Sequence, residues 1–278
     1  MERAKEQELR RFLNHLPPQT REYKYSGFQH LEGVVSEEYR RFIDENGSPL
    51  VIFTDFPPRE LKSHEERFPG RLDYSPPLKI LLLTMPSLPH EEAAEAFGYR
   101  LAFKADEMGV LKSLSLRGAT RTKTPDREKQ ADRSWAPRDL PPGRSTKWPT
   151  VAVEVAFSES CERVKRDVAW WLQESAGEVL VAISIDIKRQ SGNIYVNSYE
   201  PGRMPTRNHP NPEPKHVQEI AMSRGKDGQP PSLTGGNLII PFHKLMLRHP
   251  RHGESDFIFT REDLLEVADA VWYALEHM

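Results

Sequence analysis

Three consecutive segments decide the fold: TVAVEVAF (150–157), SESCERVKRDVAWWLQESAGE (158–178) and VLVAISIDI (179–187). In the first, valines alternate with alanines and Glu154, which is the period of a β-strand with two different faces. The second repeats apolar residues at helical spacing, and the third is almost continuously apolar, as in a strand covered on both sides. Together they predict a strand–helix–strand unit at the centre of an α/β protein.

The boundaries of this unit carry their own signals. Ser160 is placed to cap a helix that runs from Cys161 to about Ser175, and Gly177 stops it. Residues 193–199 follow the last strand through a Gln–Ser–Gly turn, so we expect them to pair with it as a hairpin.

Three further segments precede the unit. Residues 78–85 (LKILLLTM) form a β-type apolar run. Residues 89–108 place apolar side chains three and four positions apart and predict a helix that ends at Gly109. The sequence LKSLSLRGAT (111–120) alternates like a half-buried strand.

The remaining chain is assigned to extensions of this core. Residues 1–77 mix short helical segments with proline-rich connectors, and 201–235 hold seven prolines without a period. Near the end, strand-like runs precede a helix with a capping sequence at Thr260. We therefore expect an N-terminal helical and proline-rich extension (1–77), a core (78–200), an exposed connection (201–235), and a C-terminal strand and helix packing on the core (236–278).

Composition limits the classes of function. Lys and Arg number 39 against 41 Asp and Glu, so any surface for nucleic acid must be local. A single cysteine excludes an intramolecular disulfide, and the charged start lacks the apolar core of a secretory signal. No apolar run reaches the roughly 18 residues of a membrane helix. These features predict an intracellular protein of the cytoplasm or nucleus that does not enter membranes.

The order of the elements resembles the PD-(D/E)XK nuclease superfamily: strand, helix, strand, Asp-bearing turn, strand with a central glutamate, helix, strand. More narrowly, HEEAAEAFGYRLAFKADEMGV (90–110), KQADRSWAPRDLPPGRSTKWPTVAVEVAFSES (129–160) and RDVAWWLQESAGEV (166–179) look like a branch known mainly from uncharacterised fungal proteins. The resemblance implies a restriction-endonuclease-like core, in which helices flank a mixed central sheet.

The resemblance also implies a metal site. Such nucleases use carboxylates to hold a divalent ion, normally Mg²⁺, which lowers the pKa of a bound water and neutralises phosphate charge. It places Asp132 at the aspartate of the motif and Glu154 at its second acid, with Glu91 on the preceding helix as a further acid. These three residues are the expected metal ligands.

The lysine of the motif is missing from its place. It should stand two positions after the second acid, because residues i and i+2 of a strand share a face and reach the same water. Ala156 occupies that position. Lys165 and Arg166 on the next helix are the nearest cations in sequence, and arginine substitutes poorly for a proton-trading lysine. Lys165 therefore joins Asp132 and Glu154 as a candidate catalytic residue.

Each acid also has a structural explanation. Asp132 lies in a polar turn, where aspartate commonly makes local hydrogen bonds. Glu91 suits a helix start because of the helix dipole. Glu154 could face solvent at a sheet edge, but a carboxylate between valines more often needs a partner or a metal, so it is the strongest candidate.

A basic segment flanks the suspected site. Between residues 117 and 150, nine Arg and Lys stand against four acids, an excess of five. Such a run either tracks phosphates or is an ordinary solvated loop. The candidates for contact with nucleic acid are Arg133, Arg138, Arg144 and Lys147.

These observations predict a PD-(D/E)XK-like protein that acts as a Mg²⁺-dependent phosphodiesterase on DNA or RNA. Because of Ala156, the alternative is a catalytically inactive nuclease-like domain that serves as a binding or scaffold module. A third class, a small-molecule enzyme with an unrelated site in the same sheet, has no motif in its support.

Overall fold

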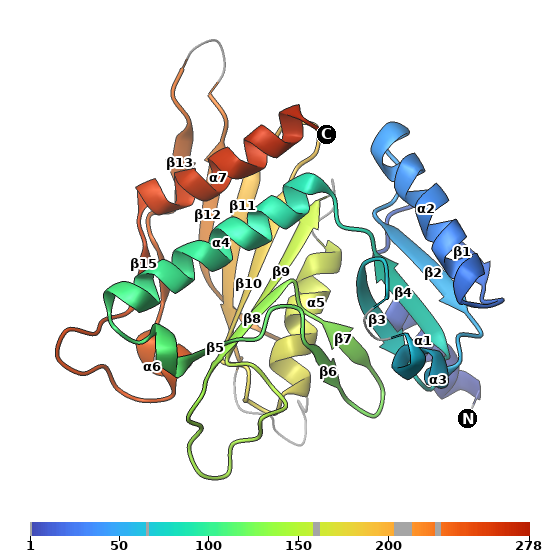
Figure 1. Ribbon diagram of the computed structural model, residues 1–278, viewed down its shortest axis with the longest axis horizontal. Helices are drawn as coiled ribbons and strands as arrows, with labels where there is room; N and C mark the ends of the chain where they lie inside the picture. The colour runs from blue at the N-terminus through green and yellow to red at the C-terminus, as the bar shows by residue number, and fades with distance from the viewer. Residues whose placement is uncertain (1, 65–66, 158–161, 203–212, 226–228) are drawn as a thin grey trace. The chain divides into compact units, whose positions relative to one another are not determined.

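The structure, a computed structural model, describes residues 2–64, 67–157, 162–202, 213–225 and 229–278. The chain forms two compact units (Figure 1). Unit 1 comprises Met1–Ser87 and Arg121–Gln130, and unit 2 comprises Leu88–Thr120 and Ala131–Met278.

Unit 1 is built on a six-stranded sheet in the order β1-β2-β4-β3-β7-β6. Its strands are β1 (Arg21–Lys24), β2 (Leu50–Thr54), β3 (Arg71–Ser75), β4 (Ile80–Thr84), β6 (Arg121–Lys123) and β7 (Glu128–Gln130). Its helices are α1 (Glu2–Leu13), α2 (Phe28–Asp44) and α3 (Pro58–Ser63). Only β1 and β2 pair in parallel; the other neighbours are antiparallel.

A buried ion pair fixes the late hairpin β6–β7 to this sheet. The Arg127 guanidinium donates to both carboxylate oxygens of Asp73, with Nε 2.6 Å from Oδ1, and both side chains are largely buried. Asp73 lies opposite Lys129 in the β3–β7 register. The pair therefore lies where the β6–β7 hairpin, about 50 residues further along the chain than β3, joins the sheet.

The predicted strand at 78–85 exists as β4, but it does not belong to the predicted core. It lies between β2 and β3, because its apolar sequence ILLLT is buried along its length and needs a neighbour on each side. The structure thus divides the chain differently from the predicted ranges 1–77 and 78–200. The first 87 residues supply four strands of a separate sheet, and residues 121–130 supply the other two.

Unit 2 is built on a seven-stranded sheet in the order β13-β12-β11-β10-β9-β8-β5. Its strands are β5 (Leu114–Leu116), β8 (Arg133–Pro137), β9 (Val151–Phe157), β10 (Val181–Ile187), β11 (Ile194–Glu200), β12 (Lys215–Ser223) and β13 (Ser232–Thr234). A 3₁₀ turn, η1 (Leu111–Ser113), precedes β5. Strands β9 and β10 are parallel and all other neighbours antiparallel, so the sheet is mixed.

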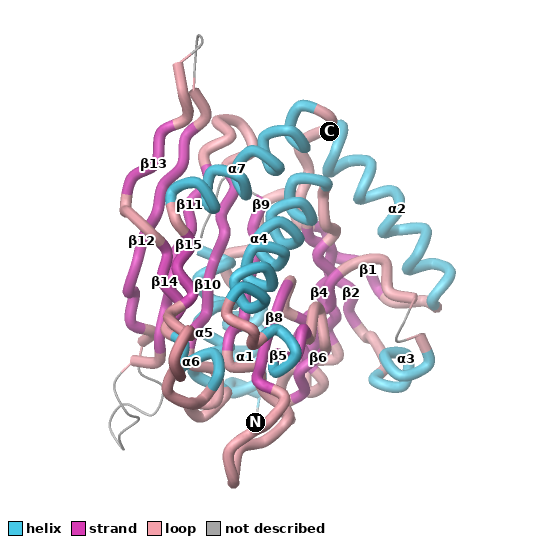
Figure 2. Tube along the Cα trace, turned by 60° about the vertical axis from the view of Figure 1, so that its left-hand side comes forward, coloured by secondary structure: helices cyan, strands magenta, loops and turns pink. Residues whose placement is uncertain are grey.

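Helices flank this sheet, and the alternation of side chains assigns the faces. Helix α5 (Glu162–Glu174) covers the face of Ala152 and Ala182, where Trp171 packs in one buried cluster with them. Helix α4 (Leu88–Glu107) covers the other face, because its Phe97 contacts Trp135, which lies opposite Val151. Figure 2 shows α7 (Arg261–Glu276) beside α4.

From α4 to β10 the predicted order of elements is confirmed: helix, strand, Asp132, strand with Glu154, helix, strand. The chain is a mixed α/β protein whose sheets are flanked by helices. The hairpin of β10 with β11 and the final helix, which Thr260 and Asp263 cap reciprocally, are also confirmed. The predicted cap at Ser160 and helix start at Cys161 lie outside the described residues.

The predicted exposed connection at 201–235 is wrong in part. Strand β12 pairs with β11 along most of its length, and β13 extends the sheet beyond it. The alternation in KHVQEIAMS buries only Ile220 and Met222, so the periodic signal is weak. The predicted C-terminal strands form a separate pair, β14 (Leu238–Ile240) with β15 (Phe257–Phe259), and a short helix α6 (Phe242–Met246) lies between them.

Within the described part of the chain, no helix combines the length and the apolar character that spanning a bilayer requires.

The buried pair in unit 1 gives a first prediction. The substitution Asp73→Asn leaves the Arg127 guanidinium buried without its counter-charge, so equilibrium urea unfolding should lose about 3 kcal/mol. The matched control is Asp55→Asn, whose exposed pair with Lys24 is worth less than about 0.5 kcal/mol. Equal effects of the two substitutions would contradict the role given to the buried pair.

Candidate functional site around Asp132 and Glu154

Asp132 directly precedes β8 and lies beside β9, with which β8 pairs. Both its backbone and its carboxylate bond to β9. Its backbone N–H donates to the Val153 carbonyl at 3.1 Å, and its Oδ2 accepts from the Val155 N–H at 2.7 Å. The residue is 4% exposed. The carboxylate is thus bound to the backbone amide directly after Glu154.

A buried histidine that the sequence analysis did not single out contacts this carboxylate. His90, in the first turn of α4, is 3% exposed and places Nε2 3.3 Å from Oδ1 of Asp132. Its Nδ1 lies 3.6 Å from Oε1 of Glu91. Neither ring nitrogen makes a well-aligned hydrogen bond, so the contacts are those of ion pairs. The predicted acids Asp132 and Glu91 therefore both face the same imidazole.

The charge of His90 follows from these neighbours. Burial by itself lowers the pKa of His90, but the carboxylates of Asp132 and then Glu91 outweigh it and raise the pKa to about 9. At neutral pH the ring is an imidazolium. In the sequence His90 is visible only as the neighbour of Glu91 in the first turn of the helix, and its contact with Asp132 is not.

Glu154 is held from the other side of the sheet. It stands in the middle of β9, is 6% exposed, and its Oε1 accepts a hydrogen bond from the indole N–H of Trp171 on α5. Trp171 is buried in the α5 cluster, and its indole N–H also positions this carboxylate. Across the parallel ladder, Glu154 is beside Ser184 of β10.

The donor set, as arranged, does not fit Mg²⁺. The ion prefers an octahedron of oxygen ligands at about 2.1 Å. Here an imidazolium already neutralises Asp132 and contacts Glu91, while the Glu154 carboxylate accepts from an indole on the α5 face. Among the described residues, no group of three His, Cys, Asp or Glu side chains is arranged to hold a metal ion.

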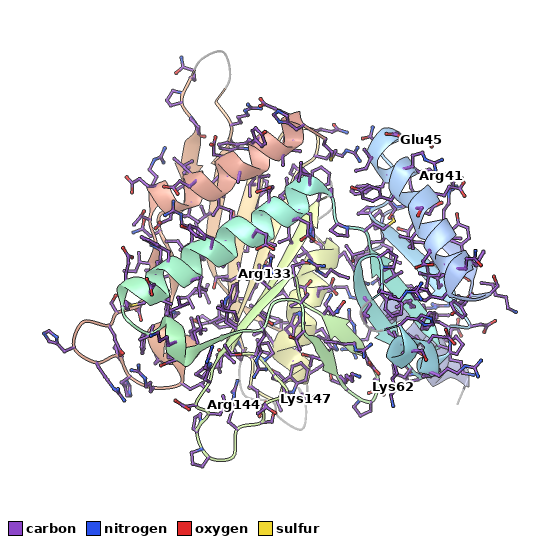
Figure 3. All side chains as sticks on the ribbon, in the orientation of Figure 1. Arg41, Glu45, Lys62, Arg133, Arg144 and Lys147 are labelled. Atoms are coloured by element: carbon purple, nitrogen blue, oxygen red, sulfur yellow. The ribbon has the colours of Figure 1, made fainter. Side chains whose placement is uncertain are left out.

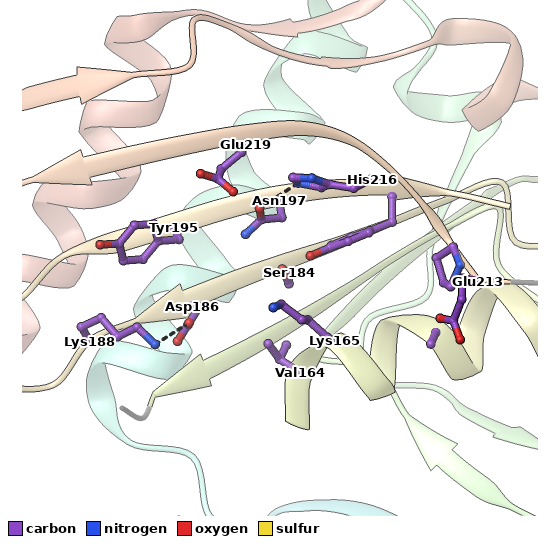
Figure 4. A pocket seen from close by; sticks show the side chains of 13 residues that line it. Val164, Lys165, Ser184, Asp186, Lys188, Tyr195, Asn197, Glu213, His216 and Glu219 are labelled. Atoms are coloured by element: carbon purple, nitrogen blue, oxygen red, sulfur yellow. Dashed lines mark hydrogen bonds and ion pairs between the residues drawn. The ribbon is translucent and has the colours of Figure 1, made fainter. Parts of the chain in front are cut away.

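The position of the missing lysine faces a charge pair. Ala156 lies beside Asp186 of β10, whose Oδ2 is 2.7 Å from Nζ of Lys188. Lys165 extends from α5 over the same face (Figure 4), and its Nζ is 2.9 Å from Oε1 of Glu162. Both lysines line a hollow of about 530 Å³ together with Ser184. Cations are therefore present on the face of Glu154, each with a carboxylate partner.

The four basic candidates do not form one surface. Arg133 pairs with Glu95 on α4, whereas Arg144 and Lys147 lie on a loop at the other end of β8 (Figure 3). Arg138 donates from Nε to the Leu114 carbonyl at 3.4 Å. Arg144 donates to the backbone carbonyl of Glu178, and burial lowers the pKa of Arg144. Lys147 lies over the Trp148 ring, 5.1 Å from its centroid. All four thus have contacts inside the protein.

Comparison with known proteins adds little to this geometry. No protein-family model matches the sequence, and no curated protein matches it. A solved structure that is similar is that of a presumed nuclease of the DUF820 family from Anabaena variabilis, at 13% identity and a TM-score of 0.40, covering 71% of this chain and 90% of that one. A likeness at this TM-score does not establish a shared fold, so the fold assignment rests on the strand order described above.

The His90 contacts give a second prediction. Because the pKa is raised from 6.5 to about 9 on folding, the protonated ring stabilises the protein fully below pH 6.5, and this stabilisation is lost as pH rises through 9. The difference in unfolding free energy between the natural protein and His90→Gln should therefore shrink by roughly 3 kcal/mol between pH 6 and 10.

The same substitution serves as the control in a direct titration. An NMR titration of the histidine ring signals should show one midpoint near 9, absent from His90→Gln and moved toward 6.5 in Asp132→Asn. If every ring in the natural protein titrates below pH 7, the ion pair described here is not formed in solution.

Proposed function

We propose that this protein is a nuclease-like domain without metal-dependent cleavage, which serves as a binding module. The observation that carries the proposal is the buried ion pair of His90 with Asp132. It stands at the aspartate that the resemblance assigns to the metal. The proposal rests on the chemistry of the residues at that point rather than on similarity to any one protein.

The ion pair opposes a metal for two reasons. A divalent ion at Asp132 would compete with a cation that is already present at 3.3 Å. Displacing that cation would also leave an imidazolium buried beside a metal, and a buried charge without its partner costs several kcal/mol. Loss of the proton instead costs free energy at neutral pH, because the carboxylates raise the pKa of His90 to about 9. Mg²⁺ binding at neutral pH is therefore disfavoured on either route.

The cations that could replace the motif lysine support the same conclusion. A lysine that trades protons must lose its proton readily, and a carboxylate partner favours the charged form. Lys165 is paired with Glu162, and Lys188 is paired with Asp186. Each amine is therefore already held by a carboxylate.

The second candidate is a Mg²⁺-dependent phosphodiesterase acting on DNA or RNA, with Asp132, Glu154 and Lys165 as its catalytic residues. One observation favours it: the hydrogen bond from the Val155 N–H ties the Asp132 carboxylate to the backbone directly after Glu154. This candidate requires His90 to leave Asp132, which is the step that distinguishes the two functions.

The two candidates make opposite predictions for metal binding. Calorimetric titration of the natural protein with Mg²⁺ or Mn²⁺ at pH 7 should show no binding below about 1 mM, and plasmid, single-stranded DNA and RNA should remain intact. Asp132→Asn and Glu154→Gln should behave in the same way, with circular dichroism to verify that each is folded. Asp269→Asn, an exposed acid on α7, is the matched surface control.

Metal binding that disappears in both Asp132→Asn and Glu154→Gln but persists in Asp269→Asn, together with cleavage that follows it, would establish the second candidate and refute the first. His90→Gln is the informative addition. Since it removes the competing cation, it should bind Mn²⁺ more tightly than the natural protein if the ion pair is what excludes the metal.

A further inference from the structure

Two arginines from separate segments of unit 2 meet at the loop that joins β8 to β9, residues 138–150. Arg144 belongs to this loop (Figure 3), and its guanidinium donates from Nη2 to the Glu178 carbonyl. Arg117, which follows β5, reaches the same loop and donates from Nη1 to the Thr146 carbonyl at 2.9 Å. The contacts of both side chains thus fix the same stretch of backbone.

These two arginines lack carboxylate partners. Within the part of the chain that the structure describes, each guanidinium makes only the hydrogen bond given above, to a backbone carbonyl, and no ion pair. The Nε of Arg144 is buried, and no described residue accepts a hydrogen bond from it. A guanidinium carries five N–H donors, so most of the donors of Arg117 and Arg144 have no acceptor in the described protein. Because buried donors in native proteins generally have acceptors, the arrangement points to a ligand that supplies them.

The two positive charges also oppose each other. Burial is the largest cause that lowers the pKa of Arg144; the Glu178 carboxylate acts in the opposite direction, and the charge of Arg117 lowers the pKa further. Burial lowers the pKa of Arg117 as well. Both shifts show that the protein by itself does not fully compensate these charges. An anion that contacts both guanidiniums would compensate them.

The net charge of the cluster matches a dianion. Lys147, exposed on the same loop, adds a third cation to Arg117 and Arg144 (Figure 3). The acid that contacts this loop is Glu178, whose carboxylate accepts from the backbone N–H and the hydroxyl of Ser145. Three cations against one carboxylate leave a net charge of +2. A phosphate monoester carries about −1.5 to −2 at pH 7, and its oxygens match the fork of a guanidinium.

Nucleic acids and small metabolites fit this cluster less well. A nucleic-acid backbone needs a continuous track of cations, but Arg133 is paired with a glutamate of α4, and Arg138 donates to a backbone carbonyl elsewhere. The Trp148 ring is 5% exposed and therefore not open to a base. Small-molecule sites are concave, whereas residues 145–147 are exposed. A phosphate group carried by a larger partner remains.

We propose that Arg117, Arg144 and Lys147 bind a phosphorylated serine or threonine side chain of a partner protein. The phosphate oxygens supply the acceptors and the negative charge that the two guanidiniums lack. Because the loop is already fixed by its contacts with the rest of unit 2, binding requires little ordering of the backbone. The proposal does not depend on whether Asp132 holds a metal.

An NMR titration of the full-length protein that follows the arginine Nε–Hε signals tests the proposal. The probes are a short peptide with a central phosphoserine, the same peptide without the phosphate, and a short single strand of thymidine nucleotides. We expect the phosphopeptide to shift the signals of Arg117 and Arg144 and to bind about tenfold more tightly than either other probe. Absence of shifts at about 10 mM phosphopeptide, equal binding of the two peptides, or tighter binding of the thymidine strand overturns the proposal.

Variants then locate the site, with circular dichroism to verify that each is folded. Arg117→Gln and Arg144→Gln each keep an amide donor for the backbone carbonyl but remove the charge, so each should weaken the phosphopeptide about tenfold. Lys147→Gln alters an exposed side chain and should weaken it roughly threefold. Arg138→Gln is the matched control, because Arg138 also donates to a backbone carbonyl but lies outside the cluster, and its affinity should be unchanged. Affinities equal to that of the natural protein in the first three variants overturn the assignment.

Discussion

The buried contact of the His90 imidazolium with the Asp132 carboxylate is the interaction on which the centre of unit 2 depends. One oxygen of Asp132 accepts from the Val155 N–H of β9, and the other faces the ring from α4. A single carboxylate thus ties a helix, the start of β8 and the middle of β9 together. Removing His90 would leave the Asp132 carboxylate buried without this counter-charge, and removing Asp132 would lower the pKa of the buried ring, so each partner sets the charge state of the other.

The charged side chains on the two faces of the sheet have different partners. Where β8 meets β9, the charges are closed into an ion pair, and Glu154 is bound by an indole N–H. On the α5 face, the lysines are likewise paired, Lys165 with Glu162 and Lys188 with Asp186. The chain thus keeps a nuclease-like order of elements while the charges at the position of the motif are closed into pairs.

Local periodicity was sufficient to predict unit 2 from α4 to β11, because Val151–Phe157 and Val181–Ile187 alternate or run apolar without interruption. It could not predict which sheet β4 joins, since pairing with β2 and β3 is a tertiary choice that its apolar sequence does not encode. Asp132 and Glu154, which the sequence indicates as site residues, are both buried. Their burial does not determine whether they hold a metal. His90 was missed because its importance lies in a contact 42 residues away, which no spacing rule reveals.

The central claim is that His90, rather than a metal, neutralises Asp132. Anomalous scattering from crystals grown at pH 7 and soaked in Mn²⁺ tests it most directly. The account predicts no anomalous peak within coordination distance of Asp132 or Glu154, with the His90 ring retained beside Oδ1 of Asp132. A peak shared by the two carboxylates, with His90 displaced, would contradict the account and establish a metal-dependent nuclease.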